Sequence, residues 1–448
     1  MNIVIVGCQN GDEGKGKFTD YFASKEGAVV RYQGGPHTGH TVETQEGRFR
    51  FVQVPSGVAR GAACFLGNGC VIDPIALALE LRQLEKQAAF PIRLVVSPRA
   101  HVVLPYHRAM DAALEAWRGD AIATSPATGF RDGSGQLGST RRGVGPCRED
   151  KIARIGLRMI DLLDEDLLKA RLARLVPLKR RIIESILPGG SQFPDEDWDP
   201  ARLAMRYAEA GRELSPYLGD VAAQVAALHS RGVPIVFEGA QSVALDVEHG
   251  TYPYCSSGNS SAGGLYAGTG LPPAFPVRVL GVMKAYATTV GGGPLPTELS
   301  GDLANRIRER GREYGTVTGR ARRVGWLDLC YIRRAVRLDG TAGLCMSSLD
   351  VLGGLDSVQV CTHYESDTAK SFEYPVSMAA LERLRPVYST LPGWPEIDPE
   401  APARGGLRAL PAALREYLDF VAKEAGVPVV AIGTGPARHH TLVTGPLA

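Results

Sequence analysis

The sequence predicts an α/β fold in which a large, mainly parallel central sheet is flanked by helices and carries helical and loop insertions. Short apolar runs rich in Val and Ile alternate with longer helical segments along the 448 residues, the pattern that parallel strands and crossover helices produce. Several of these runs end directly in glycine-rich loops. Such loops gather at the carboxyl edge of a parallel sheet, where ligands bind.

The first apolar run, residues 2–6, predicts a buried strand and leads into a glycine-rich loop. Residues 11–17 read Gly-x4-Gly-Lys, which matches most of a P-loop, a turn whose backbone N–H groups bind phosphate. Position 18 is Phe, where that motif has a Ser or Thr that binds magnesium. Asp12 is the candidate replacement, because Mg²⁺ prefers hard oxygen ligands. Taken alone, the motif is also compatible with a plain βα turn.

The remaining elements follow from the same patterns of hydrophobic periodicity. Strands are predicted at 28–33, 48–54, 65–72, 94–104, 235–237, 277–285, 343–347, 357–363 and, last, 428–432. Helices are predicted at 108–117, 150–188, 201–231, 301–311, 326–337 and 408–424. The helical stretch at about 150–231 interrupts the alternation, so we interpret the chain as one domain, 1–448, with a helical insertion. The polar segment 249–264 is long for a loop, which predicts a ligand-binding role.

The composition excludes several classes of protein. A net charge of +2 gives no reason to expect a nucleic-acid partner. No apolar run is long enough to span a bilayer, so no membrane partner is expected. The eight cysteines form no CxxC pair and no zinc spacing, and no secretory leader is visible. These features predict a cytoplasmic protein with reduced thiols.

Three further loops carry groups that suit anionic ligands. The loop after the second strand contains His40, and the loops 138–146 and 315–326 combine hydroxyls and arginines with glycines. Arginine forms bidentate pairs with phosphate and carboxylate. A solvated basic loop is the alternative for each one considered separately.

Together these loops resemble the adenylosuccinate synthetase family. The stretches that carry the resemblance span nearly the whole chain: 11–17, 31–35, 39–41, 140–151, 237–241, 249–254, 284–299 and 319–328. The resemblance implies a P-loop-like fold and a ligase that joins L-aspartate to the 6-position of IMP with GTP hydrolysis and Mg²⁺. In that chemistry the 6-oxygen is first phosphorylated, and the aspartate amine then displaces the phosphate.

The resemblance also implies roles for individual residues. Asp12 matches the general base, His40 the group that stabilises the transferring phosphoryl group, and Gln241 the amide at the 6-position. Asp12 and the carbonyl of Gly39 match the metal ligands. The implied triphosphate site is Gly11, Glu13, Gly14, Lys15, Gly16, Lys17, Gly39, Thr41, Arg322, Ser348, Asp350, Gly433 and Gly435. The implied monophosphate site is His37, Thr140, Arg154, Gln241, Ser256, Val290 and Arg320, with Arg154 supplied by the partner of a homodimer. The implied aspartate site is Thr316, Val317, Thr318, Gly319, Arg320 and Arg322.

The chain departs from the family pattern at several of these positions. The family has Asn at His37, Thr at Ser256 and usually Thr at Val317. Ser348 replaces the lysine of the guanine pocket and Gly433 replaces a serine, so ATP is an alternative to GTP. Residues 129–137 resemble an extra insertion.

Two other functions therefore stay open at this stage. One is a paralogue that performs the same chemistry on GMP, dGMP or a purine analogue in antibiotic or viral metabolism. The other is an inactive nucleotide-binding regulator. Retention of Asp12, His40, Gln241 and Arg320 argues against the regulator.

Overall fold

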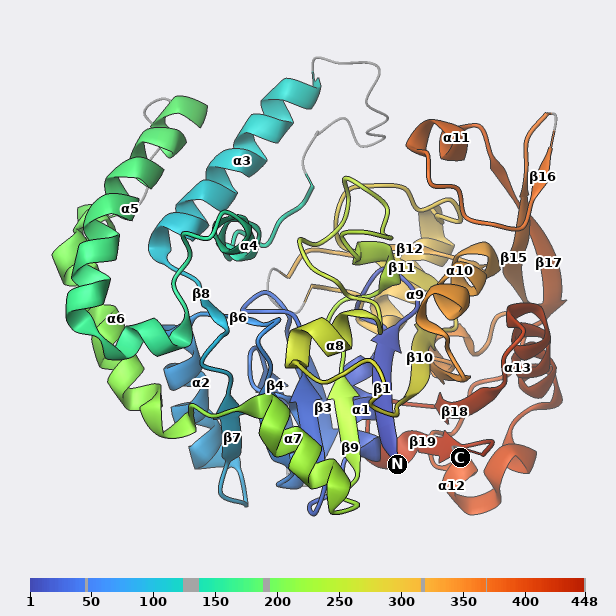
Figure 1. Ribbon diagram of the computed structural model, residues 1–448. Coiled ribbons are helices and arrows are strands. Elements are labelled where there is room, and N and C mark those ends of the chain that lie inside the picture. The colour runs from blue at the N-terminus through green and yellow to red at the C-terminus, as the bar shows by residue number, and fades with distance from the viewer. Residues whose placement is uncertain (45–46, 124–136, 188–193, 316–318, 368, 447–448) are drawn as a thin grey trace.

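The computed structural model describes residues 1–448 apart from 45–46, 124–136, 188–193, 316–318, 368 and 447–448 (Figure 1). Among the described residues, nine strands form a central sheet in the order β19-β18-β14-β10-β1-β9-β2-β5-β7. Neighbouring strands run parallel, and β19 pairs antiparallel with β18 at one edge. The predicted α/β class with a mainly parallel sheet is confirmed.

The strands of the central sheet are β1 (Asn2–Gly7), β2 (Ala28–Arg31), β5 (Ala63–Leu66), β7 (Arg93–Val96), β9 (Ile235–Glu238), β10 (Arg278–Lys284), β14 (Gly343–Ser347), β18 (Val429–Gly433) and β19 (Thr441–Val443). Smaller sheets contain β3 (His40–Thr44) with β4 (Gly47–Phe51), β6 (Val71–Ile72) with β8 (His101–Val102), β11 (Ala287–Thr289) with β12 (Arg323–Gly325), and β13 (Leu327–Asp328) with β15 (Ser357–Glu365), β16 (Lys370–Ser371) and β17 (Arg385–Pro392). The helices are α1 (Lys15–Phe22), α2 (Pro74–Gln87), α3 (Pro105–Ala123), α4 (Val144–Ile152), α5 (Glu165–Ile186), α6 (Pro200–Leu214), α7 (Val221–Ser230), α8 (Gly264–Thr269), α9 (Gly301–Gly311), α10 (Leu329–Asp339), α11 (Met378–Glu382), α12 (Ala401–Gly405) and α13 (Ala412–Ala425).

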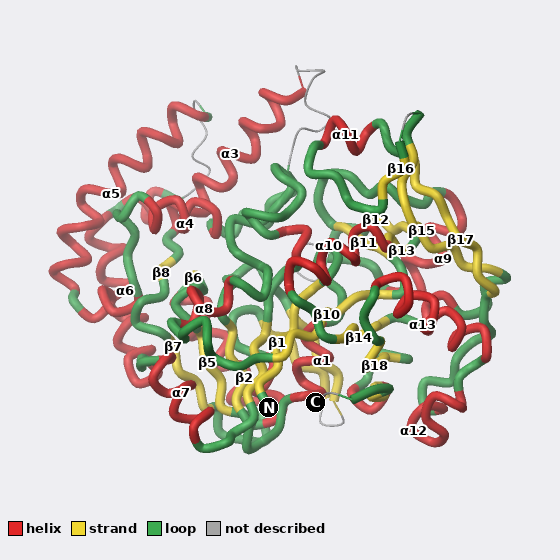
Figure 2. Tube along the Cα trace, turned by 45° about the vertical axis from the view of Figure 1, so that its right-hand side comes forward, coloured by secondary structure: helices red, strands yellow, loops and turns green. Residues whose placement is uncertain are grey.

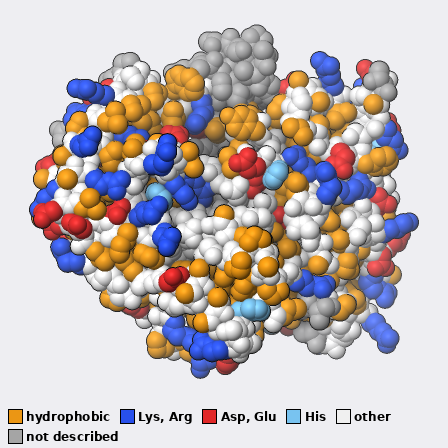
Figure 3. Space-filling view, in the orientation of Figure 1, with side chains coloured by type: hydrophobic (Ala, Val, Ile, Leu, Met, Phe, Trp, Pro, Cys, Tyr) orange, Lys and Arg blue, Asp and Glu red, His pale blue; other side chains and the backbone are white. Residues whose placement is uncertain are grey.

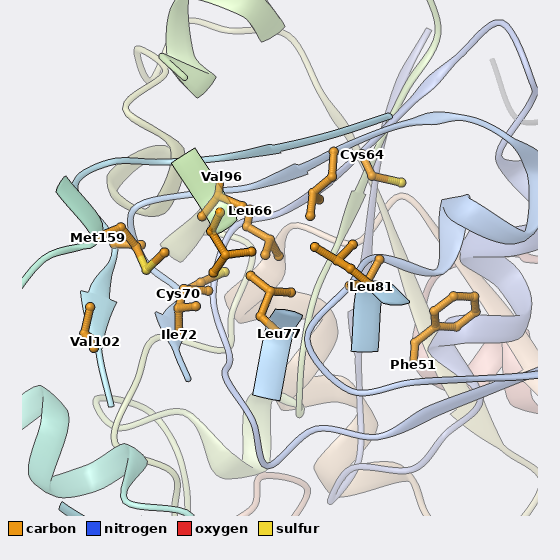
Figure 4. Packing of buried hydrophobic residues seen from close by; sticks show 14 of the residues in the cluster. Phe51, Cys64, Leu66, Cys70, Ile72, Leu77, Leu81, Val96, Val102 and Met159 are labelled. Atoms are coloured by element: carbon orange, nitrogen blue, oxygen red, sulfur yellow. The ribbon is translucent and has the colours of Figure 1, made fainter. Parts of the chain in front are cut away.

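Strand β1 is apolar because both of its faces are covered. Ile3 and Ile5 join the core on one face, where Phe18 of α1 also packs, and Val4 and Val6 join the core on the other face, which α7 and α8 cover. Alternate residues of a strand point to opposite faces, so a central parallel strand reads as a continuous apolar run. The larger of these cores extends under α2, where Leu77 and Leu81 pack with Leu66 of β5 (Figure 4).

Helices α3, α5 and α6 form a layer beside the β7 end of the sheet. Figure 2 shows them in red, apart from the yellow strands and on the side opposite α13. A buried carboxylate joins this layer to α4: Asp150 accepts from Nε2 of His107 at 3.0 Å and from Nζ of Lys179. The described helices of this layer and its neighbours run from α3, which begins at Pro105, to α7, which ends at Ser230, so helices also precede the predicted insertion at about 150–231.

The element predictions fail mainly where a run of apolar residues is not one strand. The predicted strand 65–72 is two strands, β5 and β6, and 94–104 is likewise divided into β7 and β8. Gly67 lies between the two strands, where an added Cβ would be 2.3 Å from the carbonyl oxygen of Gly268. Helix α2 was not predicted, although Asp73 caps it by accepting from the N–H of Ala76 at 3.0 Å. The strand at 428–432 is not the last one, because β19 follows it. Most of the predicted insertion at 129–137 lies outside the described residues.

In the part of the chain that the structure describes, no helix combines the length and the apolar character needed to cross a lipid bilayer.

Candidate functional site

A cavity of about 1100 Å³ opens beyond the carboxyl ends of the central strands. Its walls come from the loop after β1, the loop before β3, the segment from 137 through α4, the loop after β9 and the segment 289–294, together with Gly315, Arg320 and Arg322. The predicted ligand loops are therefore neighbours in space. Figure 3 shows the face of the molecule seen in Figure 1, with many Lys and Arg side chains over the helical layer on its left.

The loop after β1 has the backbone that a phosphate-binding turn requires. Gly11 and Gly14 have φ values of 91° and 92°, a region open to glycine, and Gly14 leads into α1. The buried carboxylate of Glu13 accepts from the N–H groups of Gln9 at 3.1 Å and Gly11 at 2.8 Å, and pairs with Lys15. The Glu13 side chain thus shapes the loop from inside and does not line the cavity, whereas Gly11, Gly14, Lys15, Gly16 and Lys17 do.

Lys17 connects this loop to the turn after β18. Its Nζ donates to the carbonyl groups of Gly435 and, at 3.3 Å, His440. An added Cβ on Gly433 would lie 2.9 Å from the same Nζ. Burial lowers the pKa of Lys17 to about 8, although the charge of Asp350 opposes the shift. The structure therefore brings the predicted C-terminal triphosphate residues next to the loop, although Ser348, Asp350, Gly433 and Gly435 do not line the cavity.

His40 lines the cavity and is held from behind by a buried carboxylate. Its Nδ1 donates to Oε1 of Glu238, which also accepts from the hydroxyl of Ser56 at 2.7 Å. Burial on its own would raise the pKa of Glu238. The charge of His40 and its hydrogen bond to Glu238 outweigh burial and lower the pKa to about 2. This pairing fixes the imidazole and leaves Nε2 for a ligand. Glu238 is not among the predicted site residues, and its place directly after an apolar strand was the available signal.

Asp12 lies opposite a second buried charge network. Its carboxylate pairs with Nη2 of Arg322 at 2.9 Å, and Nη1 of Arg322 pairs with Glu313 at 2.6 Å. Glu313 in turn pairs with Nζ of Lys284 at 2.6 Å. Burial would raise the pKa of Glu313, but the Lys284 and Arg322 charges lower it. The predicted Asp12 and Arg322 are thus joined, and Glu313 and Lys284 add support that was not predicted.

Gln241 lines the cavity between two polar neighbours. Its amide Nε2 donates to Nε2 of His37, and its Oε1 accepts from the hydroxyl of Ser260 at 3.3 Å. Burial lowers the pKa of His37 to about 3, with the Arg148 and Arg31 charges acting in the same direction. His37 is therefore neutral, and its Nδ1 has no hydrogen-bond partner among the described residues.

The predicted catalytic, metal, monophosphate and aspartate residues, together with Thr41 of the triphosphate site, divide into three groups. Those that line the cavity with His40 and Gln241 are Asp12, His37, Gly39, Thr41, Thr140, Ser256, Val290, Arg320 and Arg322. Arg154 and Gly319 are exposed and do not line it. Thr316, Val317 and Thr318 lie outside the described residues.

A glycine-rich phosphate turn, a histidine–carboxylate pair and clustered cations at one edge of a parallel sheet define a nucleotide-using α/β enzyme. Comparison with known proteins gives the family. The family model described as adenylosuccinate synthetase matches residues 4–442, and the chain belongs to this family.

Curated relatives agree over the full length. The chain is 38% identical to adenylosuccinate synthetase of Lysinibacillus sphaericus over 443 residues, covering 99% of this chain and 98% of the relative. It is 40% identical to the Syntrophobacter fumaroxidans protein with the same coverage of both chains.

Two solved structures are similar as well. The fully ligated adenylosuccinate synthetase of Plasmodium falciparum gives a TM-score of 0.86 at 28% identity, covering 99% of both chains. The cyanophage S-2L succinoaminodeoxyadenylate synthetase, bound to dGMP and dATP, gives a TM-score of 0.58 at 22% identity, covering 99% of this chain and 95% of that one. The second likeness shows the fold alone.

Proposed function

We propose that this protein is a C–N ligase of purine biosynthesis that joins L-aspartate to the 6-position of IMP and gives adenylosuccinate, with GTP hydrolysis. The observation that carries the proposal is the placement of Asp12, His40 and Gln241 around one cavity in a chain that matches the family from end to end. Both the family match and this retained constellation favour the enzyme over an inactive regulator.

In the first step Asp12 accepts the N1 proton of IMP, and the 6-oxygen attacks the γ-phosphorus. A new O–P bond forms while the bond to the nucleoside diphosphate breaks. The Arg322 guanidinium stabilises the Asp12 carboxylate that performs this proton transfer. His40, oriented by Glu238, donates from Nε2 to the oxygens of the transferring phosphoryl group, where charge develops.

In the second step the aspartate amine attacks C6 and forms the C6–N bond, the C6–O bond breaks, and inorganic phosphate leaves with the proton that the amine loses. Gln241 holds the 6-position from the wall of the cavity, and Ser260 fixes the orientation of its amide. Arg320 lines the same cavity and, with Arg322, receives the carboxylates of aspartate.

The residues also fit a bound Mg²⁺. The Asp12 carboxylate and the Gly39 carbonyl belong to loops that line the same cavity, and both offer the oxygen ligands that Mg²⁺ prefers. When bound, the ion would neutralise charge on the triphosphate, a role that Lys15 and Lys17 share.

We also propose a cytoplasmic homodimer built from single-domain subunits, with 150–231 as a helical insertion. Arg154 is exposed and does not line its own cavity, while its neighbours Ile152 and Ala153 do. The partner subunit's Arg154 would therefore complete the monophosphate site. The eight cysteines are free, consistent with a reducing compartment.

The test is a phosphate-release assay with aspartate and Mg²⁺ that crosses IMP, GMP, dGMP and dIMP against GTP and ATP, with mass spectrometry of the product. We expect turnover with IMP and GTP. Turnover with another monophosphate alone, or with ATP alone, would instead make His37, Ser348 and Gly433 specificity determinants of a paralogue. No turnover with any pair, despite nucleotide binding, would favour the regulator.

A further inference from the structure

Arg148 of α4 is a buried cation for which the described residues offer no partner. Its side chain lines the cavity but is only 9% exposed, and its Nη1 has no hydrogen-bond partner. No hydrogen bond or ion pair joins Arg148 to any residue that the structure describes. Taking an unpaired charge out of water is costly, so buried arginines are normally paired. Burial accordingly lowers the pKa of Arg148.

Asp246, the carboxylate whose charge acts on Arg148, is already engaged elsewhere. The negative charge of Asp246 raises the pKa of Arg148 and so favours its charged form, but the two side chains form no ion pair. One of its carboxylate oxygens accepts from the N–H groups of Glu248 at 2.9 Å and His249 at 3.1 Å, and the other accepts from Ser261 at 2.9 Å. The negative charge that would pair with Arg148 must therefore come from a ligand in the cavity.

A glycine creates the space in which the guanidinium lies. A Cβ added at Gly258 would lie 2.6 Å from Nη2 of Arg148 and closer still to Nη1 and Cζ. The carbonyl of Gly258 accepts from the N–H of Val247 at 3.1 Å, which holds this backbone in place. Any side chain at position 258 would thus displace the guanidinium.

The cavity that Arg148 lines also offers groups that suit a phosphate. Ser256, Ser257 and Thr140 line the same cavity and offer hydroxyls, and the neighbouring His37 is neutral, with an unpartnered Nδ1–H. A guanidinium with convergent N–H and O–H donors is the usual arrangement for binding a phosphate dianion.

We propose that Arg148, in the space left by Gly258, binds the 5′-phosphate of the nucleoside monophosphate within its own subunit. The identity of that ligand rests on the proposed function. Each cavity then has a phosphate-binding arginine of its own in addition to the one that a partner subunit would supply. Arg148 and Gly258 form a unit in this role, because one contributes the charge and the other the space.

The test is a double-mutant cycle read out by calorimetric titration with IMP and, separately, with uncharged inosine. Arg148→Met and Gly258→Ala should each weaken IMP binding about 10- to 100-fold, the range for a hydrogen-bonded charged group. The double variant should bind IMP no more weakly than Arg148→Met, because the added methyl has no guanidinium to displace. Inosine affinity and the KM for aspartate should stay unchanged.

Two variants serve as controls. Gly263→Ala lies in the same segment, has an ordinary φ of −58°, and its added Cβ would meet only the Ser261 hydroxyl, at 3.8 Å. Arg181→Met removes a charge from the exposed face of α5. Both should bind IMP like the wild type. Arg148→Lys should recover part of the affinity that Arg148→Met loses, and thermal unfolding of every variant separates lost binding from lost folding.

The proposal is overturned if Arg148→Met leaves IMP affinity unchanged, if it raises the KM for aspartate instead, or if the two substitutions are additive. Because the IMP affinities and their additivity are measured without turnover, a failed ligase assay does not affect these two outcomes; only the KM for aspartate requires an active ligase. If the wild type does not bind IMP, ³¹P NMR of inorganic phosphate decides. Phosphate binding that Arg148→Met abolishes supports the site, and equal or absent binding in both proteins contradicts it.

Discussion

The two sides of the cavity differ in how their charges are balanced. On the side of the sheet, Lys15 pairs with Glu13, His40 with Glu238 and Arg322 with both Asp12 and Glu313. On the side of the helical layer, Arg148 is buried with no protein partner among the described residues.

This difference in charge pairing separates two roles, catalysis and ligand binding. Paired groups are held in position before the substrate arrives, which is what proton transfer and phosphoryl transfer require. An unpaired buried cation gains its partner only when an anion binds, so it contributes to affinity. We infer that the sheet side performs the chemistry and the helical side binds the monophosphate.

The largest effect is expected at Asp12. Asp12→Ala removes the proposed general base, and kcat should fall about 10²- to 10⁴-fold. Steady-state kinetics with saturating substrates measure the change, and Asp302→Ala, in the exposed first turn of α9, is a matched control. A loss of only a few-fold would show that Asp12 is not the base.

A smaller loss is expected when the support of His40 is removed. Glu238→Gln keeps the shape of the side chain but not its charge, and kcat should fall about 10- to 100-fold, the worth of a charged hydrogen bond. An unchanged kcat would show that Glu238 contributes packing only.

A substitution of Arg154, the cation that we propose reaches the partner's cavity, tests whether it binds the monophosphate without taking part in the reaction. Arg154→Leu should raise the KM for IMP about tenfold and leave kcat nearly unchanged, as expected for a group that binds but does not react. Equal loss of kcat and kcat/KM would place this arginine with the catalytic groups instead.

The smallest effect concerns stability and pH. Because the pKa of Glu238 is lowered to about 2 in the folded protein, its ionised form stabilises the fold at every pH above the ordinary glutamate pKa of about 4.3. That contribution should be lost as the pH falls from about 4.3 towards 2. The difference in Tm between the wild type and Glu238→Gln should therefore shrink over this window, and a constant difference would contradict the assignment.

The sequence predicted the elements and loops around the candidate site that depend on local pattern. The loop after β1 was predicted from its glycines and lysines, because its conformation depends on residues that are adjacent in the chain. The boundaries of β14 were predicted correctly, since β14 is an apolar run buried throughout.

Relations between distant residues were not predicted. His40 and Glu238 are 198 positions apart, and only the adjacency of β9 and β2 brings them together. Arg148 looks like an ordinary helical arginine until the fold places Gly258 against it. For groups far apart in the chain, such contacts decide whether a charge is paired, and no local motif contains that information.

The most direct test of the division between the two sides is calorimetric titration of IMP into the Asp12→Ala protein. If the sheet side performs the chemistry and the helical side binds, this inactive variant should hold IMP with an affinity within a few-fold of the wild type. Loss of IMP binding in parallel with loss of turnover would contradict the division, because Asp12 would then be needed to hold the substrate in place.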